Sequence, residues 1–123
     1  LAHGAAGSGS KAMENLGKYD KFQGDRLGRF LDKMADTPEG NGSMLDNTIV
    51  YYGTSNSKTH VNRNYPLLVA GGSNLGIRHC GYHNFLTTGK QPLCNLYLTF
   101  LQSLGVTAKN FSDSTGLIKE ILA

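Results

Sequence analysis

IVYYGTSNSKTHVNRNYPLLVAGG, residues 49–72, is the stretch that decides how this chain is expected to fold. Two short runs of β-branched, aromatic and aliphatic residues, 48–52 and 66–70, enclose a polar loop, and two glycines end the second run. Such runs predict buried strands. Because open α/β sheets bind ligands in the loops at strand ends, this loop is the first candidate for a functional site.

Amphipathic helices are predicted on either side of this stretch. Over residues 11–35, apolar side chains recur at helical spacing: Leu16, Tyr19, Phe22, Leu27, Phe30, Leu31 and Met34. Gly17, Gly24 and Gly28 each cost a helix roughly 1 kcal/mol relative to alanine, so it needs tertiary support or bends there. Such a stripe usually packs on a core, although it also suits docking to a partner.

A second helix is predicted to open at Pro92 and to stop at Gly105. A small hairpin over residues 77–86 precedes it, and a short terminal helix capped by Asp113 or Ser114 follows. The order helix, strand, strand, helix indicates the α/β class. Residues 1–10, rich in glycine and alanine, are expected to form a flexible segment or a site loop.

Composition excludes two classes of function. The 123 residues are one domain at most, and a net charge of +3 without clustered cations argues against nucleic-acid binding. No apolar run approaches the ~20 residues that a membrane span requires. The abrupt start without methionine favours a fragment or a processed chain.

Three motifs in order carry a resemblance to a known family. They are KYDKFQGDRLGRFLDKMADTPEGNGSMLDNTIVYYGTSNS (18–57), NYPLLVAGG (64–72) and DSTG (113–116). Together they resemble the C-terminal part of a bacterial exported family, domain of unknown function 1552, also named for an HxxSHH motif. The likeness runs from about residue 1 to residue 118.

The resemblance implies an alkaline-phosphatase-like metallohydrolase fold, a three-layer sandwich with a mixed sheet flanked by helices. Residues 1–123 would be a single segment, the C-terminal part of a larger α/β domain. Its partners would be other protein subunits or the missing N-terminal part of the same domain. A periplasmic or extracellular location is expected, because the relatives are commonly secreted.

The resemblance also points to metal ligands. Ser55 and Asn56 stand where the superfamily places an acidic ligand followed by histidine or asparagine, and His60 matches a family histidine. His3 falls on the HxxSHH motif. His3, Asn56 and His60 are therefore candidate ligands for zinc, calcium or manganese. However, no acidic residue lies between Asp46 and Asp113, and a two-metal site needs several carboxylates, so the favoured interpretation is a degenerate site without a cofactor.

Three further sets of side chains are candidates for an anion site, a zinc site and a disulfide. Lys58 and Arg63 suit a phosphate or sulfate ester, or are ordinary solvated cations. His79, Cys80 and His83 make half of a zinc site, but no second ligand pair is evident. In the oxidising compartment that the resemblance implies, a Cys80–Cys94 disulfide is preferred, which would stabilise by about 3 kcal/mol.

Two functions remain. The favoured hypothesis is a non-catalytic structural or accessory subunit of an exported bacterial assembly, because the framework motifs are present while site positions carry serine, asparagine, alanine and glycine. The alternative is the C-terminal segment of a metal-dependent phosphate- or sulfate-ester hydrolase.

Overall fold

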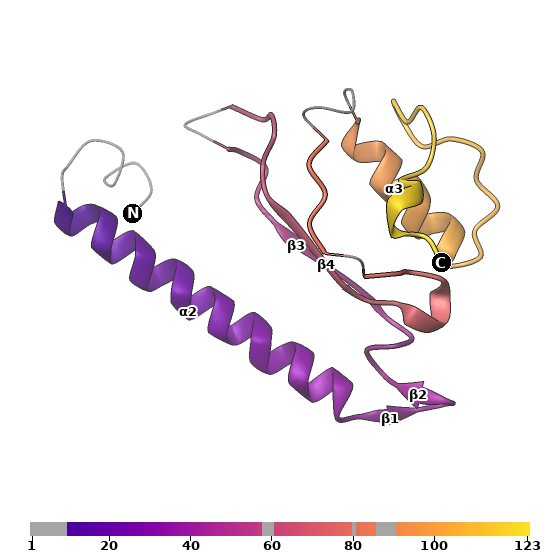
Figure 1. The fold of residues 1–123 in the computed structure, drawn as a ribbon, viewed down its shortest axis with the longest axis horizontal. Helices are drawn as coiled ribbons and strands as arrows, with labels where there is room; N and C mark the ends of the chain where they lie inside the picture. Colours follow the sequence, from indigo (N-terminus) through magenta and orange to yellow (C-terminus); the bar gives the residue numbers. More distant parts are fainter. Residues whose placement is uncertain (1–9, 58–60, 80, 86–90) are drawn as a thin grey trace.

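The computed structural model describes residues 10–57, 61–79, 81–85 and 91–123 and has a mixed α/β composition. Its elements, in chain order, are α2 (Ser10–Ala35), β1 (Pro38–Glu39), β2 (Gly42–Ser43), β3 (Ile49–Gly53), β4 (Leu67–Gly71), the 3-10 turn η1 (Ser73–Leu75), α3 (Leu93–Ser103) and the 3-10 turn η2 (Lys119–Ile121). The predicted α/β class is confirmed at this level. Figure 1 shows α2 and α3 on opposite sides of the β3–β4 hairpin.

Helix α2 is one continuous helix, starting one residue earlier than predicted. It passes through Gly17, Gly24 and Gly28 without a break in the helix. Of its apolar stripe only Met34, in the last turn, is buried. None of the helices in the described part of the chain combines the length and apolar character needed to cross a bilayer.

Strands β3 and β4 form an antiparallel hairpin that lies within one residue of the predicted strands. The register pairs Ile49 with Gly71 and Gly53 with Leu67, and the described residues of the connecting loop are 54–57 and 61–66. The end near Ile49 is half-buried, and the end beside the loop is exposed. Within the described residues the two strands pair only with each other, as do β1 and β2.

Helix α3 contributes two side chains, Leu96 and Leu98, to the buried core. Pro92 caps this helix, and Gly105, with φ of 81°, follows its last turn, as predicted. The buried apolar side chains are Met34, Ile77, Leu96, Leu98 and Ile118. The helix also buries two polar residues, which bind the C-terminal segment and are described below.

Two smaller predictions were wrong. Ile77 pairs with Leu122 in an isolated bridge, and residues 78–79 and 81–85 form no strand, so the hairpin predicted at 77–86 is absent from the described residues. The C-terminal segment forms only the 3-10 turn η2 rather than an α-helix. Both follow from one cause: the backbone near Ile77 bonds to residues 121–123, including Arg78 N–H to the Ile121 carbonyl at 2.8 Å.

Candidate functional site

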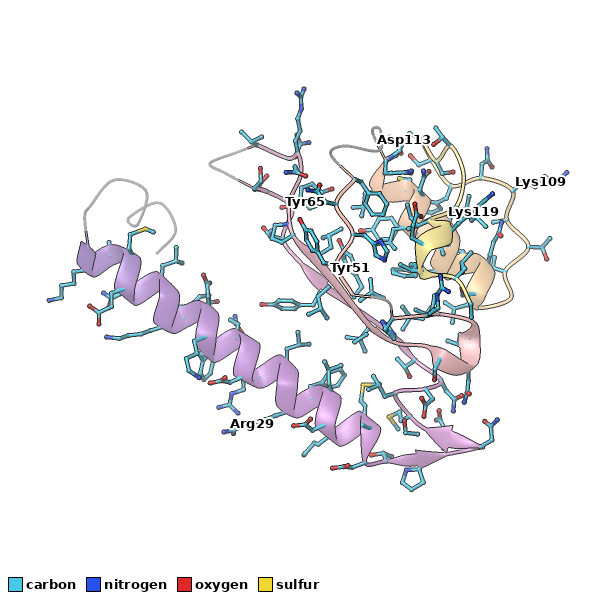
Figure 2. The ribbon with its side chains drawn as sticks, viewed as in Figure 1. Arg29, Tyr51, Tyr65, Lys109, Asp113 and Lys119 are labelled. Carbon is cyan, nitrogen blue, oxygen red and sulfur yellow. The ribbon has the colours of Figure 1, made fainter. Side chains whose placement is uncertain are left out.

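The loop at the tip of the hairpin borders a pocket of about 250 Å³. Strand β3 and the loop contribute one wall, and the first turns of α3 contribute the other. The lining residues are Tyr51, Gly53, Thr54, Ser55, Tyr65, Leu93 and Tyr97. Figure 2 labels Tyr51 and Tyr65, which reach the pocket from the strand and from the end of the loop.

Aromatic contacts join two of the lining residues to each other and to Phe111. The Tyr51 ring meets Tyr97 of α3 edge-to-face, with centroids 5.9 Å apart, and Tyr97 meets Phe111 in the same way at 6.0 Å. Such pairs add about 0.5–1.5 kcal/mol to the area they bury. Burial, together with a hydrogen bond to Tyr97, raises the pKa of Tyr51 to about 12.

The predicted metal ligands are only partly described. His3 and His60 lie outside the described residues, and so does Lys58. Asn56 is exposed, and its backbone closes a small turn: its N–H donates to Thr54 Oγ1 at 3.3 Å, and that hydroxyl donates to the Asn56 carbonyl at 3.2 Å. Arg63 is exposed in the same loop. Metal binding by His3, Asn56 and His60 therefore stays a prediction, and so does anion binding by Lys58 and Arg63.

The cysteine and histidine cluster is also described in part. Cys94 carries a free thiol on the first turn of α3, while Cys80 lies outside the described residues, so their pairing stays a prediction. A hydrogen bond to the Asp113 carboxylate, and then burial, raise the pKa of the Cys94 thiol. His79 Nε2 lies 2.7 Å from the Gly71 carbonyl oxygen, and His83 stacks on Phe85. Over the described residues, no three His, Cys, Asp or Glu side chains form a group that would hold a metal.

Asp46 has a structural role that was not predicted from the sequence. Its Oδ2 accepts hydrogen bonds from the N–H and the hydroxyl of Ser43 at 2.8 and 2.7 Å, and its Oδ1 accepts one from the Ser73 hydroxyl at 2.5 Å. These bonds tie the turn before β3 to η1 after β4. The Ser73 bond, and then those from Ser43, lower the pKa of Asp46 to about 2. Asp46 is thus an anchor of the hairpin's base.

We predict that Asp46→Asn destabilises the protein at neutral pH and that the difference from wild type disappears in acid. A carboxyl whose pKa is lowered by folding stabilises the native state above its unfolded pKa of about 3.9, and this stabilisation is lost as pH falls toward about 2. Urea midpoints of both proteins at neutral pH and at steps between about pH 4 and pH 2 measure this. Asp32→Asn, on an exposed turn of α2, is the control. A constant gap across that range would contradict the assignment.

Comparison of the chain with known protein families, with curated proteins and with solved structures finds no match in any of the three. The family suggested by the sequence motifs therefore stays a prediction. The structure does assign a local role to each motif: TPEGNGSMLDNT forms the turn held by Asp46, PLLVAGG contains β4, and DSTG binds the first half of α3.

Proposed function

We propose that this chain is a non-catalytic, alkaline-phosphatase-like structural or accessory subunit of an exported bacterial assembly, periplasmic or extracellular. The observation that supports the proposal best is the apolar face of α2, which is open to solvent over most of its length. The three-layer sandwich, with a mixed sheet between its helices, is part of the same proposal.

The apolar face of α2 carries large side chains that are open to solvent. Tyr19 and Phe30 are 46% and 51% exposed, and Leu16, Leu27 and Leu31 on the same face are only half-buried. Fully burying one large apolar side chain stabilises a complex by about 1.5–3 kcal/mol. Soluble monomers rarely leave a continuous apolar stripe uncovered, so such a stripe marks an interaction surface.

Charged side chains define the opposite, solvent-facing side of α2. Lys18 binds Glu14 at 2.6 Å and Lys21 binds Asp25 at 2.7 Å, each across one helical turn. These pairs are well exposed and contribute only about 0.3–0.5 kcal/mol each. Because the charges satisfy one another along the helix, the apolar face is the side available to a partner protein.

The β3–β4 hairpin also favours binding to a partner protein. A two-stranded sheet is marginally stable alone and usually gains further strands or a covering helix. Tyr52 and Leu68, opposite each other in the register, alternate with Tyr51 and therefore lie on the face of the hairpin turned away from α3. Both are 43% exposed. A partner that covers α2 would thus find a second apolar surface on the hairpin.

We predict that Phe30→Ser weakens association with the partner subunit at least about tenfold. Removing an aromatic side chain that the partner buries in the complex costs more than 1.4 kcal/mol. The tagged protein is purified from its native cells, and light scattering after size-exclusion chromatography measures the mass and fraction of the complex. Lys18→Gln, on the charged face, is the matched control and should leave the complex intact.

Two results would contradict the proposal. One is a wild-type protein that is monomeric at micromolar concentration, with Phe30→Ser behaving identically. The other is a purified protein that holds molar amounts of zinc, calcium or manganese and hydrolyses a generic phosphate or sulfate ester. That second result would instead support the metal-dependent hydrolase.

A further inference from the structure

We infer that Asn41 is a modification site. Its side-chain amide reacts spontaneously with the backbone nitrogen of Gly42, which converts residue 41 to aspartate or isoaspartate and weakens the turn that Asp46 holds. The protein itself is the substrate, and water is the co-reactant. This inference goes beyond the proposed subunit role and does not depend on it. It rests on the turn between β1 and β2, every residue of which is described.

The Asn41–Gly42 pair has the chemistry for this reaction. Asn41 is the one asparagine in the sequence that is followed by glycine. Glycine carries no side chain to shield its backbone nitrogen, and its backbone adopts conformations that other residues avoid. The attacking nitrogen and the carboxamide are also held next to each other by the chain, which favours ring closure over any reaction between separate molecules.

The reaction balances without an oxidant or a reductant. The Gly42 nitrogen forms a bond to the Asn41 Cγ, the bond between Cγ and Nδ2 breaks, and the Nδ2 group leaves as ammonia with the proton of the Gly42 amide. The cyclic imide then takes up one water molecule and opens at either of its carbonyls. One product is aspartate, and the other is isoaspartate, which has an extra methylene in the backbone.

The structure places this pair where the reaction can proceed. Gly40 and Asn41 are the two turn residues between β1 and β2, and both Asn41 and Gly42 are exposed. Each strand has only two residues, and so short a hairpin opens readily to the conformations in which the Gly42 nitrogen reaches the carboxamide. Asn74 Nδ2 donates a hydrogen bond to Asn41 Oδ1 at 3.1 Å. This donor faces the oxygen on which negative charge develops during the attack.

The products disturb the hydrogen bonds of Asp46. Gly42 lies against this carboxylate, because a Cβ at Gly42 would be 2.8 Å from Asp46 Oδ2. The next residue, Ser43, donates its N–H and its hydroxyl to the same oxygen at 2.8 and 2.7 Å. The extra methylene of isoaspartate shifts Gly42 and Ser43 relative to Asp46. Both products also add a negative charge to a turn that already carries Glu39 and Asp46. Converted protein is therefore less stable than fresh protein.

The test incubates the purified chain at neutral and mildly alkaline pH in water labelled with heavy oxygen, and peptide mass spectrometry follows each asparagine. Residue 41 should lose its amide nitrogen and gain one labelled oxygen at least about tenfold faster than Asn56. Asn56 is the internal comparison, because it is also exposed and is followed by the small residue Ser57. The rate should rise with pH, because the attacking nitrogen must lose its proton. Fragmentation of the peptide distinguishes aspartate from isoaspartate.

Asn41→Gln is the matched control. It keeps a side-chain amide at an exposed position, but its longer side chain closes a larger and less favourable ring. The midpoint of urea unfolding should fall in wild type as residue 41 is converted and should stay constant in Asn41→Gln over the same incubation. The inference is overturned if residue 41 reacts no faster than Asn56, or if wild type loses stability no faster than Asn41→Gln.

Discussion

Gly71→Ala is expected to destabilise the protein by about 3 kcal/mol or more, the largest effect of any single methyl group added to the hairpin. Gly71 ends β4 with φ of 75°, a left-handed conformation that costs an alanine about 1–2 kcal/mol. A Cβ at this position would also collide with the backbone carbonyl oxygens of Leu45 and Thr48. These are backbone atoms at the base of the hairpin, so they cannot move aside without shifting the turn that Asp46 holds.

A second glycine, Gly76, separates the cost of the left-handed conformation from the cost of the collision. Gly76 has φ of 79°, almost the same conformation, but beyond its two chain neighbours no described atom lies within 4 Å of the position its Cβ would occupy. Gly76→Ala should therefore cost only the conformational term of about 1–2 kcal/mol. Urea unfolding of both variants measures the difference. Equal destabilisation would show that the collision at Gly71 relaxes freely.

The secondary structure could largely be predicted from local pattern. Helical spacing found α2 within one residue, and the apolar runs found β3 and β4 with a shift of one residue. Pro92 and Gly105 gave the bounds of α3 correctly. These elements depend on short-range rules, since spacing, proline and glycine act within a few residues of themselves.

The predictions that failed concern segments whose structure depends on contacts between residues far apart in the sequence. The segment after Ile77 contains no local signal that its backbone would bond to residues 121–123, so a hairpin seemed plausible where a bridge to Leu122 forms. The pocket was missed for a similar reason. Tyr51 and Tyr65 enclose the same loop in the sequence, but Leu93 and Tyr97 come from a helix that no spacing rule joins to it.

The predicted metal site lies in the same loop, but that prediction depends on carboxylate and imidazole ligands. Ser55, predicted to stand at the position of an acidic metal ligand, lines the pocket between the hairpin loop and α3. The motifs TPEGNGSMLDNT, PLLVAGG and DSTG act in the framework, because their glycines, Asp46 and the backbone of DSTG hold turns and helices together.

Asn95→Leu is expected to destabilise the protein by about 2–4 kcal/mol, because one buried side chain holds the DSTG segment to α3. Asn95 is 2% exposed. Its Oδ1 accepts the N–H groups of Thr115 and Gly116 at 2.7 and 3.3 Å, and its Nδ2 donates to Thr115 Oγ1 at 3.2 Å and to Gln91 Oε1 at 2.7 Å. Leucine fills similar space but leaves those partners without their bonds, and each unsatisfied group costs about 1–3 kcal/mol.

The location of the damage makes this prediction specific. One turn further along α3, Thr99 is fully buried and its hydroxyl accepts the Ile118 N–H at 2.9 Å, so the segment has a second attachment. Hydrogen exchange should therefore accelerate at the Thr115 and Gly116 amides more than at Ile118. Gln102→Ala, which removes one exposed bond to the Ala108 carbonyl on the same helix, should cost about 0.5–1.5 kcal/mol and leave those amides protected. Unchanged protection at residues 115 and 116 in Asn95→Leu would mean that other contacts hold the segment, and that the amide network is not what joins it to the core.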